Sequence, residues 1–360
     1  MSLTKSKVFS YLIIFVSSLL ALALIELGLQ LIKKNDDWYV TTDANILRNF
    51  EFLYDISSLY NSDEDYADVI RDQYGLRDDC NGTENIEILT IGGSTTDQRY
   101  VPFKSTFQKI IQEKLRSENP TFGCVSNAGV DGHSTWGHIF AFEKWFPLIP
   151  NLQPKYVLLY IGINDADFTR TTPVLGYDIL DKKSIKGFLK QSQLVQKLLP
   201  IYRHYRYKQL NKERSSAFQG HKQAQFNLND YIETDLHKDT IYLSKINSLS
   251  FKNRLEILLN YIDEMGASPI CVTQPHRYVK NINGVLKGIP NILGEEFSGI
   301  DYDYSIKEIN SIIFQLCSIN TLDLYNKDLS DDLFYDGIHT TPLGSREIGN
   351  AMATFIIENY

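Results

Sequence analysis

The sequence is poor in cysteine and has no excess of positive charge. It holds 4 cysteines in 360 residues, with no Cys-x-x-Cys pair and no His/Cys spacing typical of a zinc site, so we predict neither a metal centre nor a cofactor. The formal net charge is -8, which argues against nucleic acid as a partner. No internal repeat or low-complexity tract stands out, which argues against a repeat architecture.

Charged residues are also absent from a long N-terminal run. Val8–Ile25 reads VFSYLIIFVSSLLALALI, and apolar character resumes after Glu26. The run is long enough to cross a bilayer as a helix, so we interpret residues 1–34 as a single-pass anchor. Ala21-Leu-Ala23 also resembles a signal-peptidase site, and a cleaved signal peptide is the alternative. Lysines flank both ends, so the positive-inside bias is slight, but both interpretations put the body in the periplasm or outside the cell.

That compartment permits disulfides. Cys80 lies just before one apolar run and Cys124 opens the next. If these runs are neighbouring parallel strands, both cysteines lie at the same edge of the sheet, and a Cys80–Cys124 disulfide is sterically reasonable. Cys271 and Cys317 are interpreted equally well as packed free thiols or as a second bond.

Beyond the anchor, residues 35–83 are interpreted as a polar, acidic connector, with a solvated stretch at 61–68. From about residue 84 to residue 360, short continuous apolar runs alternate with helical patterns, which is typical of a parallel sheet covered on both faces. The expected strands are Ile86–Ile91, Cys124–Ala128, Tyr156–Ile161, Pro269–Thr273 and Thr321–Leu324. The expected helices include Phe107–Leu115, Trp136–Phe146 and Phe251–Met265.

One stretch, 167–245, interrupts this alternation. It contains a basic, tyrosine-rich run at 202–214. Two interpretations stay open: an amphipathic helix with a solvated basic face, or a lid that grips an anionic or sugar substrate or rests on anionic lipid.

Polar, glycine-marked segments follow the expected strands. They are Gly92-Gly-Ser94, Asn127-Ala-Gly-Val-Asp-Gly132, Gly162-Ile-Asn164-Asp165 and Asp336-Gly-Ile-His339. Ligands of a doubly wound sheet bind at the carboxyl ends of its strands, so we expect these segments to meet there.

These residue types suit acyl transfer. A serine hydroxyl needs a base, for which His339 is the candidate, and an imidazole needs its other nitrogen held, for which Asp336 is three residues away. The backbone amides of Ser94 and Gly132 and the side-chain amide of Asn164 are candidate donors to an oxyanion. Ser94 could instead be a helix N-cap or part of an anion-binding loop.

The four segments together resemble the SGNH hydrolases, also called GDSL esterases, over roughly residues 84–358. The resemblance implies Ser94 as nucleophile, Gly132 and Asn164 as oxyanion donors, and Asp336 and His339 as the rest of a catalytic triad. The first block departs from the family, since it reads Gly-Gly-Ser-Thr rather than Gly-Asp-Ser. The implied fold is a flavodoxin-like three-layer α/β/α sandwich with a mainly parallel five-stranded sheet.

Other residues near these blocks receive weaker assignments. Gly93, Thr95 and His276 are tentative substrate-binding residues. Asp165 is expected to brace neighbouring loops, and His133 and His138 to be surface or helix-packing residues rather than ligands. The Gly-x-Ser-x-Gly pattern of α/β-hydrolases is not met, because residue 96 is Thr.

The sequence therefore predicts a membrane-anchored, extracytoplasmic serine esterase. Its expected substrate is a small acyl ester, such as an acetyl ester on an envelope or extracellular polysaccharide. An O-acyltransferase with the same triad is the second hypothesis, because the two share an acyl-enzyme. A catalytically silent module that binds a glycan or a partner protein is the third.

Overall fold

The computed structural model describes residues 5–31, 44–168, 221–292 and 296–360, together with residues 38, 41, 192, 194, 195, 198, 202 and 205. These residues fall into two compact units, which we treat separately. One unit contains helix α1 and the described residues between 192 and 205. The other contains the described residues from 41 to 168 and from 221 to 360.

Helix α1 spans Lys5–Leu31. Its segment Phe9–Leu29 has a mean hydropathy of 2.5 and is not buried within the protein, and by length and composition it is able to cross a membrane. Glu26 interrupts this apolar helix. Its carboxylate accepts hydrogen bonds from Ser192 Oγ, at 2.8 Å, and from the Leu194 amide, at 3.0 Å.

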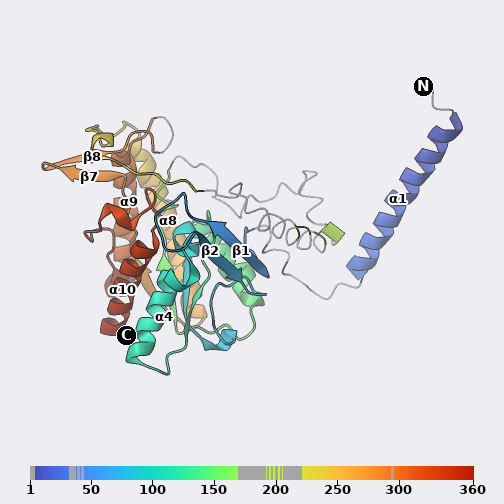
Figure 1. Ribbon diagram of the computed structural model, residues 1–360, viewed down its shortest axis with the longest axis horizontal. Helices are drawn as coiled ribbons and strands as arrows, with labels where there is room; N and C mark the ends of the chain where they lie inside the picture. The colour runs from blue at the N-terminus through green and yellow to red at the C-terminus, as the bar shows by residue number, and fades with distance from the viewer. Residues whose placement is uncertain are drawn as a thin grey trace. The chain divides into compact units, whose positions relative to one another are not determined.

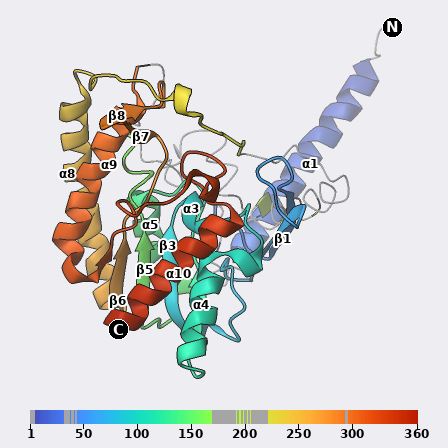
Figure 2. The same ribbon diagram turned by 60° about the vertical axis from the view of Figure 1, so that its left-hand side comes forward.

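The larger unit is built on a five-stranded sheet, seen with its flanking helices in Figures 1 and 2. The strands are β3 (Ile86–Gly92), β4 (Cys124–Asn127), β5 (Tyr156–Tyr160), β6 (Ser268–Val272) and β9 (Thr321–Leu322). Their order is β4-β3-β5-β6-β9, and every neighbouring pair is parallel. This is the flavodoxin-like order, and it confirms the fold class predicted from the sequence, strand by strand.

Helices cover both faces of the sheet, as Figure 2 shows. Helices α4 (Phe107–Glu118) and α10 (Pro342–Asn359) pack together on one face, and α8 (Thr240–Glu264) and α9 (Gly299–Cys317) on the other, where α5 (Thr135–Phe140) packs on α8. Between the sheet and the helices of the first face lies a core of aliphatic and aromatic side chains that includes Ile88, Phe107, Ile111, Leu158 and Met352. Burial of such side chains is the main source of stability.

The helix ends follow local capping chemistry. The Thr341 hydroxyl accepts from the Gly344 amide at 3.2 Å, and Pro342 occupies the first turn of α10, where a missing N–H costs nothing. Two helices differ from the sequence prediction. Helix α5 ends at Phe140 and continues as a π-helical turn. Helix α8 begins 11 residues before the predicted Phe251, because the exposed Ile241 and Ile246 obscure its apolar periodicity.

The segment that the sequence presented as a connector is a packed part of this unit. It forms an antiparallel ribbon of β1 (Phe50–Asp55) and β2 (Tyr66–Arg71). Alternate residues of β1, including Phe52 and Tyr54, are buried. The stretch 61–68, expected to be solvated, is exposed at 61–63 and 65, but its last three residues belong to β2 and Ala67 is buried. The alternation of apolar and polar residues in β1 is the signal of a half-buried strand, and the acidic composition around it hid that signal.

A second hairpin, β7 (Val279–Ile282) and β8 (Val285–Gly288), also went unpredicted. Asn283 and Gly284 join its strands with φ of 56° and 83°. Asn-Gly is the preferred sequence for such a two-residue turn, so the signal was present in the sequence.

Two disulfides link the described cysteines. Cys80 and Cys124 are joined with a Cα–Cα distance of 5.7 Å, and Cys271 and Cys317 with one of 6.3 Å. The first pair is the one that strand adjacency suggested, and the second settles an alternative that the sequence left open in favour of a bond. Most of the predicted insertion 167–245, including residues 169–191 and 206–220, lies outside the described residues.

Candidate active site

The polar segments after β3, β4 and β5 and the loop before α10 meet at the carboxyl edge of the sheet. Ser94 is the first residue of the short helix α3 (Ser94–Asp97), directly after β3. Strands β3 and β5 are neighbours, so Ser94 and Asn164 lie beside the point where the strand order reverses. This is the edge at which the sequence predicted the segments to gather.

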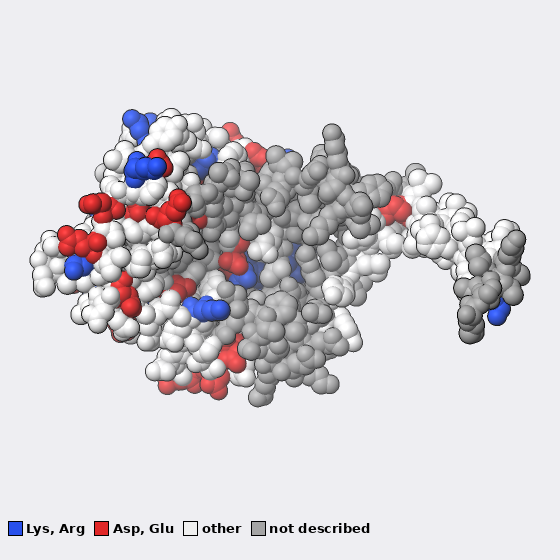
Figure 3. All heavy atoms as spheres, turned by 90° about the horizontal axis from the view of Figure 1, so that it is seen from above, with Lys and Arg blue, Asp and Glu red and all other residues white. Residues whose placement is uncertain are grey.

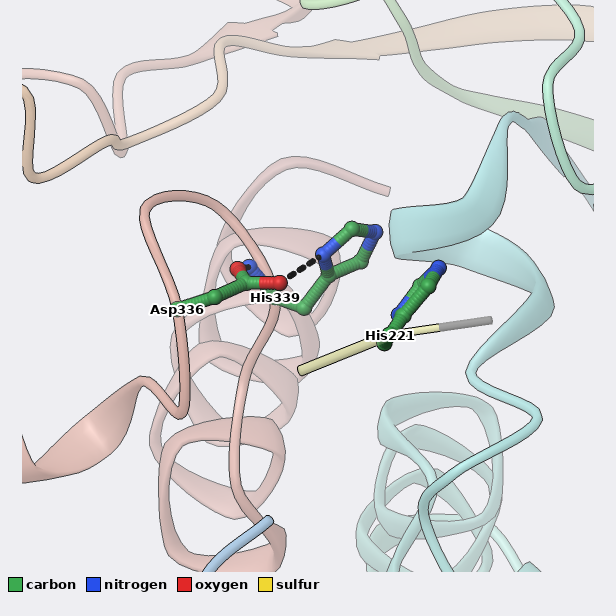
Figure 4. A group of neighbouring side chains, drawn as sticks. All are labelled: His221, Asp336 and His339. Atoms are coloured by element: carbon green, nitrogen blue, oxygen red, sulfur yellow. Dashed lines mark hydrogen bonds and ion pairs between the residues drawn. The ribbon is translucent and has the colours of Figure 1, made fainter. Parts of the chain in front are cut away.

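Ser94, His339 and Asp336 form a hydrogen-bonded chain. The Ser94 Oγ lies 2.8 Å from His339 Nε2, and His339 Nδ1 lies 2.7 Å from Asp336 Oδ2. Figure 4 shows the Asp336 carboxylate beside the His339 ring, with His221 on the far side of that ring. A carboxylate oxygen only accepts, so Nδ1 carries the hydrogen and Nε2 is free to accept the proton of Ser94.

The carboxylate of Asp336 is fixed by its own loop. Its Oδ1 accepts from the amides of Ile338, at 2.9 Å, and His339, at 2.7 Å. Burial by itself raises the pKa of Asp336, but the charge and hydrogen bond of His339 and the two amides outweigh burial and lower it. Asp336 is therefore ionised at neutral pH and holds the imidazole in one tautomer.

The three candidate oxyanion donors come from the segments after β3, β4 and β5. The Ser94 amide lies at the N-terminus of α3, where no intrahelical acceptor exists. Gly132 has a φ of 79°, a conformation that a residue with a Cβ rarely adopts. Asn164 Nδ2 donates to the His133 carbonyl at 2.8 Å, which uses one of its two hydrogens and leaves the other available.

Gly93 makes room for Asn164. A Cβ at position 93 would lie 2.4 Å from Asn164 Nδ2, so only glycine permits this side chain to approach so close to Ser94. Thr95 is buried, and its hydroxyl accepts from Gln274 Nε2 at 2.7 Å. Gln274 Oε1 in turn accepts from the Ile163 amide at 2.9 Å, so Gln274 joins the Ser94 and Asn164 segments.

His276 is bonded to other side chains and backbone of the protein. Its Nε2 is 3.2 Å from Asp303 Oδ1, and its Nδ1 accepts from the Tyr278 amide at 3.2 Å. Both ring nitrogens are thus occupied within the protein, and a contact of His276 with substrate stays a prediction. The residue of this segment that bonds to the Ser94 and Asn164 segments is Gln274, two residues after β6.

Asp165, the acid next to Asn164, bonds to residues of α5 and α8 rather than to His339. Its carboxylate accepts from the Thr135 amide and hydroxyl and pairs with Arg254 at 3.2 Å. Burial raises the pKa of Asp165 more than Arg254 and Thr135 lower it. It links the loop after β5 to α5 and α8. His133 and His138 are both buried, so neither is a surface residue, and both pack on or within α5 as the alternative expectation had it.

A histidine that the sequence analysis did not single out lies against His339. The rings of His221 and His339 lie 4.1 Å apart, and His221 Nδ1 is 2.7 Å from the Tyr335 hydroxyl. Burial and the neighbouring His339 lower the pKa of His221 to about 3, so the ring is neutral. His221 follows the tyrosine-rich part of the predicted insertion, where no local pattern pointed to a site.

A cavity of about 10 Å³ adjoins Ser94 Oγ, which is room for roughly one water molecule. Its lining residues come from α3, the loops that follow it, the His339 loop and the His221 segment: Ser94, Thr95, Gln98, Arg99, Tyr100, Val101, His221, Tyr335, His339 and Thr340.

Among the described residues, one group of three side chains has the spacing of metal ligands, namely His221, Asp336 and His339. Asp336 and His339 already bond one another, and His339 also bonds Ser94. The donors of this group are therefore engaged in the serine chain.

Comparison with known proteins finds similarity between this chain and solved structures only. No protein-family profile and no curated protein matches the chain. A lipolytic G-D-S-L family protein from Veillonella parvula is 15% identical, with 76% of this chain and 98% of that chain covered and a TM-score of 0.39. A catalytic mutant of Axe2, an acetylxylan esterase from Geobacillus stearothermophilus, is 14% identical, with 75% and 93% covered and a TM-score of 0.40. The acetyl xylan esterase AlAXEase is 14% identical, with 75% and 98% covered and a TM-score of 0.37.

Proposed function

We propose that this chain is a serine esterase of the SGNH type that hydrolyses a small acyl ester. The observation that carries the proposal is the chain of hydrogen bonds from Ser94 Oγ through His339 to Asp336, at 2.8 and 2.7 Å. A serine next to an imidazole whose other nitrogen is held by a carboxylate is an activated nucleophile.

The reaction follows from the positions of these groups. Ser94 Oγ attacks the ester carbonyl carbon while its proton moves to His339 Nε2. The carbonyl oxygen becomes an oxyanion, which accepts from the amides of Ser94 and Gly132 and from Asn164 Nδ2. The intermediate then expels the alcohol, which takes the proton from His339. Water repeats the sequence on the acyl-enzyme and restores Ser94.

The cavity beside Ser94 is narrow. Its space of about 10 Å³ holds roughly one water molecule and is bounded by bulky side chains, including Tyr100 and Tyr335. Any acyl group therefore requires these rings to move, and an acetyl group requires the smallest movement. An O-acetylated polysaccharide remains the proposed substrate class, and helix α1 is proposed as the anchor that keeps the enzyme at the envelope.

An O-acyltransferase with the same triad is the second candidate, because the two reactions share the acyl-enzyme. If an acceptor hydroxyl takes the acyl group, breakdown of the acyl-enzyme accelerates with the concentration of added sugar. If water takes it, that rate is independent of the sugar.

The test of the shared site is Ser94→Ala. We expect it to abolish turnover of a chromogenic acetyl ester, and labelling by a fluorophosphonate probe, without changing the thermal unfolding of the protein. Undiminished turnover in this variant contradicts the proposal.

A further inference from the structure

The loop that carries Gly132 is held by the N-terminal part of the same unit. Its next residue, His133, is 2% exposed and its Nε2 lies 2.7 Å from the carbonyl oxygen of Ala44, which is fully buried. A carbonyl only accepts, so Nε2 carries the ring hydrogen. Burial lowers the pKa of His133 to about 4, so the ring is neutral.

Three further contacts join the same two segments. Asn45 Nδ2 donates to the Asp131 carbonyl at 3.2 Å, and Arg71 Nη2 donates to the Gly129 carbonyl at 2.7 Å. The Arg77 amide donates to the Asn127 carbonyl at 3.1 Å. The loop is therefore held at every second residue from 127 to 133 by groups from residues 44–77, which we call the brace.

The same loop holds Asn164 from the other side. The His133 carbonyl accepts from Asn164 Nδ2 at 2.8 Å, and Gly132 immediately precedes His133. The His133 ring also packs tightly on α5, since a Cβ at Gly137 would lie 2.4 Å from its Cγ. A shift of His133 thus moves two of the three candidate oxyanion donors together.

We propose that the brace positions two of the oxyanion donors, the Gly132 amide and the Asn164 side-chain amide. His133 is the positioning residue that connects the brace to both donors. This inference rests on the proposed esterase function. The brace touches no reacting atom. It acts because an error of about 1 Å in the position of a catalytic group is able to cost about 100-fold in rate.

His133→Leu replaces the imidazole with an apolar side chain of similar bulk, and so removes the hydrogen bond to the Ala44 carbonyl. We expect kcat for phenyl acetate to fall by about 10- to 100-fold, with KM within about twofold. His133→Gln keeps an N–H donor on a side chain of similar length, and we expect it to restore most of the loss. His138→Leu is the matched control, because it removes the buried histidine whose ring lies 6.1 Å from that of His133 and leaves the His133–Ala44 hydrogen bond in place. We expect it to have near wild-type kcat.

A second substrate distinguishes misplaced oxyanion donors from a general disturbance of the active-site structure. The sulfur of a thionoester is a weak hydrogen-bond acceptor, so its hydrolysis depends less on the oxyanion donors. We expect His133→Leu to lower kcat/KM for the oxygen ester by at least about tenfold more than for the thionoester. Equal losses on both esters, or no loss on either, overturn the inference.

Asn45→Gly covers the case in which His133→Leu does not fold. Asn45 is exposed and has a φ of 57°, which glycine adopts freely, so the change removes only the contact to Asp131. We expect a loss of about 3- to 10-fold on the oxygen ester with the same substrate dependence. Asn151→Gly, at φ 57° elsewhere on the surface, is its control.

A wild-type protein without Ser94-dependent turnover refutes the proposed function itself. If the wild-type protein is active and the Asn45→Gly variant turns over the oxygen ester at the same rate, only the proposed role of the brace is refuted.

Discussion

Asp336→Asn tests the part of the site that acts through charge and tautomer rather than through contact with substrate. Asp336 Oδ1 accepts from two backbone amides, and Oδ2 accepts from His339 Nδ1. An asparagine has one acceptor oxygen, and the two amides require it. Its NH₂ group then faces Nδ1, which must give up its hydrogen. The imidazole is left with its hydrogen on Nε2, where it has to accept the proton of Ser94.

The size of the effect follows from this geometry. Because the side chain keeps its shape, the 2.8 Å approach of Ser94 Oγ to Nε2 stays intact, but in the wrong tautomer it no longer serves base catalysis. In serine hydrolases this exchange lowers kcat by about 10⁴-fold. At 1.36 kcal/mol per factor of ten, that loss is about 5 kcal/mol of transition-state stabilisation.

The assay is kcat for a chromogenic acetyl ester, with thermal unfolding to show that the fold persists. Asp332→Asn is the matched control, since Asp332 is an exposed acid in the same loop region and its side chain is absent from the hydrogen-bonded chain. We expect the control to retain wild-type activity. If Asp336→Asn keeps more than about a tenth of wild-type kcat, Asp336 does not fix the tautomer and the triad is wrong.

Two further predictions concern stability. Burial by itself raises the pKa of Asp97, but the adjacent Arg99 and Arg71 outweigh it and hold the pKa below its ordinary value. The stabilisation is therefore present above about pH 4 and lost as the pH falls. We expect Asp97→Asn to lower the free energy of unfolding by about 3 kcal/mol at pH 7 and by less at pH 2.5, measured by urea denaturation. An equal loss at both values contradicts an ionic role. Neither side-chain atom of buried Asn310 has a hydrogen-bond partner among the described residues, so Asn310→Leu should raise the free energy of unfolding by about 1 kcal/mol in the same assay.

The parallel sheet was predictable because its strands are buried on both faces. A central strand such as Tyr156–Tyr160 is apolar at every position and fully buried, so its pattern does not depend on distant contacts. Strand order was predictable only by way of the family resemblance. The ribbon of residues 50–71 was missed for the opposite reason, because its outer face is charged and only alternate residues enter the core.

The site was predictable as far as its residues stand in short segments at strand ends. Asp336 and His339 are three residues apart, and one loop brings them together. His221 and Gln274 were not assigned to the site, because nothing local distinguishes them. Gln274 acquires its role from Thr95 and Ile163, which lie far from it in the sequence.

The acidic residues near Ser94 show why spacing alone does not assign a triad. Asp97 and Asp165 each lie five residues after the end of a strand, and both are buried more deeply than Asp336. Asp97 is neutralised by Arg71 and Arg99, and Asp165 by Arg254, so each carboxylate has a cation as its partner. Asp336 is held by two amides and one imidazole, none of which carries a permanent charge. Of the three, only its negative charge remains unbalanced until His339 takes up a proton, which is the moment at which catalysis by a serine requires it.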